Sequence, residues 1–187
     1  MSSCDANGDN CYQTQGAGTG NPAQQKPLVI SKLQKSGKNY DKVVGTLNKI
    51  TDTIDPQCLS FLQSGGNNLQ STVDTLLSGN LLAVGSFVSG YAAITQATGT
   101  NLAPGDAAIV VNSLSAFFNF DQTVDQGKYQ GGTAGADAFI LLHELAHLLE
   151  AKKFQPDGPS VPNSAQAGKD NDKLIDQNCQ KTLGGFK

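Results

Sequence analysis

The sequence contains no tryptophan, no arginine and only two histidines among its 187 residues. All 13 basic residues are therefore lysines, and the formal net charge is -3 at pH 7. Nucleic-acid binding depends largely on Lys and Arg side chains that neutralise phosphates, so this charge balance argues against DNA or RNA as a partner. No run of 18 apolar residues is present, and we therefore expect no membrane span.

A signal-peptide pattern is also missing from the start of the sequence, which predicts a mature product or an excised domain. None of the four cysteines forms a CxxC pair, and a cysteine zinc site is not expected. Their even number permits two disulfides, Cys4–Cys11 and Cys58–Cys179, with four free thiols in a reducing cytosol as the alternative. The low charged fraction, the many Ser, Thr, Asn and Gln residues and the paired cysteines favour a secreted protein.

The two histidines that are present stand in the motif His143-Glu144-Leu145-Ala146-His147. Residues four apart lie one above the other on the same face of a helix, so both imidazoles can bind one metal ion. Glu144 lies beside that face, where it could take a proton from a zinc-bound water. The motif predicts a catalytic zinc site with His143 and His147 as ligands and Glu144 as the general base. Core histidines, or a purely structural zinc site, are the alternatives.

The residues around the motif predict a helix over 136–153, because this range is rich in good helix formers and contains neither Gly nor Pro. Glycines precede it, and Pro156 and Gly158 follow it. Apolar residues spread over most of its circumference, which indicates a helix buried on several sides. Two histidines and a glutamate are costly in such a place unless a metal ion or other partners satisfy them.

A catalytic zinc ion keeps three protein ligands, and the sequence offers no third histidine. Glu150 lies on the same helix, about 10 Å along the axis from His143, which is too far to share one ion comfortably. Asp157 follows in the turn-forming segment 155–158, where the chain can fold back under the metal. It ranks first as the third ligand, although a plain turn aspartate is the alternative.

Two further carboxylates, Asp172 and Asp176, lie four residues apart in a helix predicted over 170–182. One of them could be a zinc ligand while the other orients a histidine ring. Asp172 ranks second as the third ligand, and a solvated start of the helix is the alternative for both residues. Tyr91 and Tyr129 are the tyrosines nearest to the site in sequence, and neither is assigned as an oxyanion donor.

The motif, together with later segments, resembles a group of small bacterial metallopeptidase-like domains of the zincin superfamily. Those domains often stand at the C-terminal end of large secreted, repeat-containing proteins. The resemblance covers mainly residues 107–182 and rests on the motif and on 154–158, Asn171 and 175–179. It implies a zinc-peptidase fold and raises Asp157 as the third ligand. The family more often has Gly at the position of Glu150.

The chain as a whole predicts a flexible Gly, Asn and Gln rich arm over 1–38 and one domain over 39–187. The expected fold is α+β and zincin-like, with a small mixed sheet whose edge strand packs on the buried motif helix. Periodicity predicts helices over 40–54, 58–63 and 69–77 and a strand over 107–120. By resemblance, residues 109–114 are the edge strand that pairs with substrate, with Ile109, Val111 and Asn112 in contact with it.

These patterns together predict a secreted zinc metalloendopeptidase that acts on protein or peptide substrates through a Glu-activated water. One alternative is a toxin module or binding domain that keeps the zincin scaffold with little or no hydrolysis. A second alternative is a structural module that zinc stabilises. The sequence leaves the substrate preference and the oligomeric state open.

Overall fold

The computed structural model describes residues 2–4, 10–13, 29–87, 91–95, 108–157 and 164–186. For 2–4, 10–13, 29–32 and 164 it describes only the backbone. Within these residues the protein has five α-helices and two β-sheets, which confirms the predicted α+β class. No helix in this part of the chain combines the length and the apolar character needed to cross a membrane.

The larger sheet has six strands in the order β1-β2-β3-β4-β6-β5. Strands β4 and β6 are parallel, and the other neighbours are antiparallel. The strands are β1 (Ser2–Cys4), β2 (Asn10–Gln13), β3 (Val29–Gln34), β4 (Leu82–Ser86), β5 (Ala93–Thr95) and β6 (Ile109–Asn112). A separate hairpin consists of β7 (Thr123–Val124) and β8 (Tyr129–Gln130), joined by a short 3-10 turn over Asp125–Gly127.

The helices are α1 (Lys38–Thr53), α2 (Pro56–Leu62), α3 (Leu69–Ser78), α4 (Ala134–Leu148) and α5 (Ser164–Gly184). Side chains cap the first turns of three of them: Asp55 caps α2, Asn68 caps α3 and Thr133 caps α4. A 3-10 turn over Gln63–Gly65 extends α2. The helices predicted over 40–54, 58–63 and 69–77 are confirmed within a few residues at each end.

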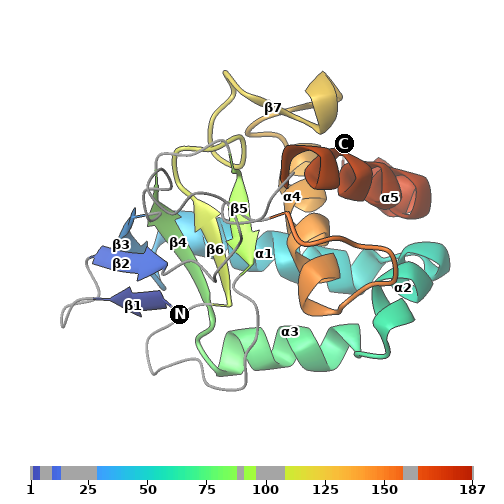
Figure 1. Cartoon of the computed structure of the whole chain (residues 1–187), viewed down its shortest axis with the longest axis horizontal. Coiled ribbons are helices and arrows are strands. Elements are labelled where there is room, and N and C mark those ends of the chain that lie inside the picture. Colours follow the sequence, from blue (N-terminus) through green and yellow to red (C-terminus); the bar gives the residue numbers. More distant parts are fainter. Residues whose placement is uncertain are drawn as a thin grey trace, which may run out of the picture.

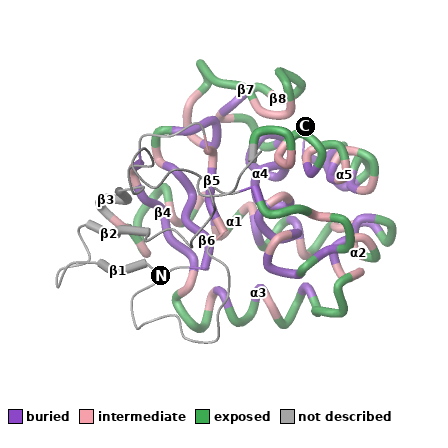
Figure 2. Tube along the Cα trace, in the orientation of Figure 1, coloured by how far each residue is buried: buried purple, intermediate pink, exposed green. Residues whose placement is uncertain are grey.

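Helix α4 occupies the centre of the molecule, between strand β5 and helices α1 and α5 (Figure 1). Every α4 residue is buried except Ala134, His143 and His147, as the purple tube in Figure 2 shows for most of its length. Leu141, Leu142 and Leu145 have no exposed surface at all. The packing therefore leaves the two motif histidines partly exposed on a helix that is otherwise buried beyond its first residue.

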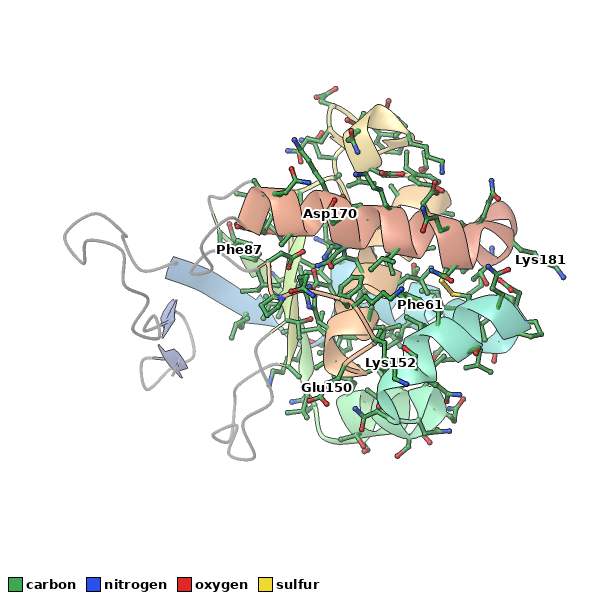
Figure 3. The ribbon with its side chains drawn as sticks, turned by 45° about the vertical axis from the view of Figure 1, so that its right-hand side comes forward. Phe61, Phe87, Glu150, Lys152, Asp170 and Lys181 are labelled. Carbon is green, nitrogen blue, oxygen red and sulfur yellow. A yellow bond between two sulfur atoms is a disulfide. The ribbon has the colours of Figure 1, made fainter. Side chains whose placement is uncertain are left out.

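A buried disulfide between Cys58 of α2 and Cys179 of α5 confirms the predicted pair. Figure 3 shows it as a yellow bond between these two helices. The same helix ends are joined by Asp55, whose Oδ2 accepts hydrogen bonds from the Thr182 hydroxyl at 2.6 Å and from the Thr182 amide at 3.1 Å. The disulfide and these bonds fix the C-terminal half of α5 on α2.

Two predictions concern the N-terminal residues: an arm over 1–38 and a Cys4–Cys11 disulfide. The boundary at residue 38 is wrong, because β3 lies within the range predicted as an arm and pairs with β4. In β1 and β2 the backbone register places Cys4 opposite Cys11, but their side chains lie outside the described part, so that disulfide stays a prediction.

Three predicted element boundaries are also corrected. The strand predicted over 107–120 is only Ile109–Asn112, because the Asn112 carbonyl accepts from the Ser115 hydroxyl and its side chain accepts from the Leu114 amide, which turns the chain. The motif helix ends at Leu148 rather than at residue 153. Helix α5 begins and ends outside the predicted range 170–182.

The end of α4 is a Schellman motif, in which the Ala151 amide donates to the Ala146 carbonyl and the Glu150 amide to the His147 carbonyl. This geometry requires a left-handed residue, and Glu150 adopts it with φ of 52°. Gly65 lies against the same turn: a Cβ there would come within 2.5 Å of the Leu149 and Glu150 carbonyl oxygens. Figure 3 shows Glu150 and Lys152 at this end of α4.

We expect the double substitution Cys58→Ala and Cys179→Ala to lower the free energy of unfolding by about 2–5 kcal/mol, because the disulfide restricts the unfolded chain over a long loop. Urea denaturation measures this change. Reduction of the wild type should give a comparable loss, and an unchanged midpoint in both cases would contradict a stabilising role.

We also expect Glu150→Gly to raise the free energy of unfolding by about 1 kcal/mol, because glycine adopts the left-handed conformation without a Cβ penalty. Glu150→Ala is the matched control, since it removes the same charge but keeps the Cβ. If alanine stabilises the protein as much as glycine in the same denaturation experiment, backbone strain is not the cause.

Candidate metal centre

The structure brings together His143, His147 and Asp157, the three residues that the sequence predicted as metal ligands. One ligand atom from each lies within 4.8 Å of the others, so the group could hold a metal ion. The Nε2 atoms of His143 and His147 lie 2.9 and 2.8 Å from Oδ2 and Oδ1 of Asp157. The three side chains are only 12–17 % exposed. Two imidazoles and one carboxylate are a donor set that leaves further coordination positions open.

Asp157 reaches the histidines because the chain reverses direction after α4 and is held there by Asn171 of α5. The Asn171 side chain accepts from the Gln155 amide at 2.8 Å and donates to the Gln155 carbonyl at 2.7 Å. It also donates to Oδ2 of Asp157 at 2.9 Å. Asn171 has no exposed surface, so these bonds take place away from competing solvent.

Asp172, the next residue of α5, binds the other side of the His143 ring. Its Oδ1 lies 2.9 Å from His143 Nδ1. A carboxylate in this position fixes the orientation of an imidazole whose Nε2 faces a metal. Asp176, by contrast, pairs with Lys128 and Tyr129 of the β7–β8 hairpin. Of the two carboxylates considered for this role, the geometry favours Asp172 as the residue that orients the ring.

The ionisable groups of the site shift one another's pKa values. Burial alone would lower the pKa of the His143 imidazole, but its bonds to Asp157 and Asp172 raise that pKa to about 10. Burial would raise the pKa of the Asp157 carboxyl, but the bonds from His143 and His147 hold it well below its usual range. A metal ion bound by these atoms would replace the His143 proton as the positive charge facing Asp157.

Glu144, the predicted general base, is 7 % exposed and binds a threonine of the sheet. The Thr95 hydroxyl lies 2.6 Å from Glu144 Oε2. Burial raises the pKa of the Glu144 carboxyl, which the nearby imidazoles of His143 and His147 lower only in part. A carboxylate whose pKa is raised is better suited to accept and return a proton.

The Phe154 ring forms an apolar wall beside the two imidazoles. Its centroid lies 5.0 Å from that of His143 and 4.6 Å from that of His147, with both contacts edge-on. Phe61 of α2 contacts Phe154 in turn, at 6.3 Å between centroids. Helix α2, which the disulfide joins to α5, therefore also supports the ring that packs on both histidines.

The predicted substrate contacts at Ile109, Val111 and Asn112 are contradicted by the strand order. Strand β6, which contains them, lies between β4 and β5 and is hydrogen-bonded on both sides, so it has no free edge for a peptide. All three residues are buried. The Asn112 side chain donates to the carbonyls of Phe87 and Tyr91. Strand β5, not β6, is the outermost strand beside α4 in the described sheet.

Several residues of the site were given no role by the sequence. Thr95 lies 49 positions from Glu144 and has no distinguishing local pattern. Asn171 and Phe154 belong to segments that carried the family resemblance, but nothing local indicated their contacts with Asp157 and the histidines. The Tyr129 hydroxyl lies 3.3 Å from Asp176, so its described hydrogen bond is not to the ligand group.

Comparisons of the chain with protein-family models, with curated proteins and with solved structures find no significant match. The functional conclusion therefore depends on the geometry of the site itself.

We expect Asp172→Ala to lower the Zn²⁺ affinity about 10- to 100-fold, because His143 loses the carboxylate that orients its ring. Competition with a chromophoric chelator measures the affinity. Asp170→Ala is the control, since it removes the same charge from the exposed side of the same helix. Equal affinities for the two variants would mean that Asp172 acts only through its charge or not at all.

Proposed function

We propose that the protein is a zinc-dependent metalloendopeptidase with a zincin-like fold. The observation that carries this proposal is the convergence of His143, His147 and Asp157 within 4.8 Å, with the buried Glu144 next to His143 on helix α4. Zinc accepts imidazole nitrogen and carboxylate oxygen ligands, and three protein ligands are typical of its catalytic sites. When bound, the ion would supply a Lewis acid that polarises the attacking water and the peptide carbonyl.

The residues of the chain have separate tasks in this proposal. Glu144 takes a proton from the attacking water and passes it to the leaving amine. Asp172 keeps the His143 ring oriented, and Asn171 holds Asp157 in place through its bond to Oδ2. Phe154 shields one side of both imidazoles from solvent.

The substrate proposed for this site is an extended peptide that adds to the outer edge of β5. Main-chain hydrogen bonds to an edge strand bind a peptide largely without regard to its sequence. Strand β5 takes the place that the sequence assigned to 109–114, because it is the last strand of the described sheet and packs on α4. The buried Cys58–Cys179 disulfide supports the further proposal that the protein acts outside the reducing cytosol.

A binding domain on the same scaffold is the second candidate. The observation in its favour is that the Tyr129 hydroxyl, a candidate oxyanion donor, is hydrogen-bonded to Asp176. A site that binds zinc but lacks a donor for the developing oxyanion would hydrolyse peptides slowly.

We expect purified wild-type protein to contain one zinc ion per chain and Asp157→Ala to lose most of it, as elemental mass spectrometry would measure. Glu144→Gln should keep the metal and lose at least about 100-fold in hydrolysis of unfolded casein, because the general base is removed. Zinc in the wild type without any hydrolysis would favour the binding domain. No zinc, even after it is supplied, would refute the zinc peptidase and would also favour the binding domain.

A further inference from the structure

The hydrogen bond between Thr95 and Glu144 joins the sheet to the proposed base. Thr95 is the last residue of β5, and its hydroxyl lies 2.6 Å from Glu144 Oε2 and 3.2 Å from the Glu144 carbonyl oxygen. A hydroxyl has one proton to donate, and the shorter distance assigns it to the carboxylate. The distance is typical of an O–H donor on an ionised carboxylate, which is a strong class of hydrogen bond.

The position of the Thr95 hydroxyl is itself well determined. The backbone of Thr95 pairs with Ile109 of β6, which has no exposed surface. Threonine is branched at Cβ, so its χ1 angle has few alternatives in a strand. The Glu144 side chain, by contrast, has three rotatable bonds and would lose its orientation without a partner. The donor is therefore fixed by the sheet, and the carboxylate is held by the donor.

We propose that Thr95 is the positioning residue for Glu144, holding the carboxylate towards the water that it deprotonates. This inference rests on the proposed peptidase function. It also gives β5 two roles, since the strand proposed to bind the substrate backbone would carry the hydroxyl that orients the base. A peptide bound to β5 and the carboxylate of Glu144 would then share one rigid support.

The chain offers a direct measurement of this contact, because Glu144 and Glu150 are its only glutamates. Protein labelled with ¹³C at the glutamate carboxyls gives two signals, which Glu144→Gln assigns. At one fixed pH, Thr95→Val should move the Glu144 signal and leave the signal of the exposed Glu150 in place. Thr95→Ser, which keeps the hydroxyl, should restore the wild-type position. An unmoved Glu144 signal in Thr95→Val overturns the proposal.

Kinetics on the zinc-loaded protein provide the second readout, with an internally quenched peptide chosen from a casein cleavage site. Thr95→Val should lower kcat about 10- to 100-fold and leave KM and Zn²⁺ affinity within about twofold, because a misplaced base slows the chemical step alone. Thr95→Ser should recover most of the loss. Thr123→Val makes the same chemical change on β7 and should leave kcat unchanged.

These experiments test the positioning role of Thr95 separately from the peptidase function. A kcat in Thr95→Val equal to or above that of the wild type means that Thr95 does not hold Glu144 productively. A wild type that cleaves no peptide refutes the peptidase function instead, and the carboxyl signals then decide alone whether Thr95 orients Glu144.

Discussion

The burial of α4 is the constraint on which the rest of the structure depends. A helix enclosed by β5, α1 and α5 can keep polar side chains only where partners satisfy them. His143 and His147 are satisfied by Asp157, and Glu144 is satisfied by Thr95. Thr95 lies 49 residues before Glu144, and Asp157 lies beyond the turn that follows α4, so the polar groups of the motif take their partners from outside the helix.

Helix α5 has a different task at each of its ends. Its first half supplies Asn171 and Asp172, which hold the turn at Asp157 and the ring of His143. Its second half carries Cys179 and Thr182, which attach the helix to α2. A rigid helix fixed at one end positions side chains at the other, so the buried disulfide contributes to the geometry of the site as well as to stability.

The main elements could be predicted from the sequence because their signals are local. Helical periodicity and Gly or Pro breaks indicated α1 to α3 and the motif helix, and the cysteine count allowed the Cys58–Cys179 pair. The end of α4 at Leu148 could not be predicted, because Glu150 occupies a left-handed position that usually belongs to glycine. The edge strand was misplaced because strand order depends on pairing between distant segments.

For the site, the sequence by itself determined the candidate metal-binding motif, since the spacing of His143, Glu144 and His147 places all three on one helix, two of them on one face. It also reduced the candidates for a third ligand to a few aspartates by elimination. Only the tertiary structure decided among them, placing Asp157 against both Nε2 atoms and Asp172 against Nδ1 of His143. The same holds for Thr95, because contacts across 49 residues arise from the packing of β5 on α4 and leave no pattern in the local sequence.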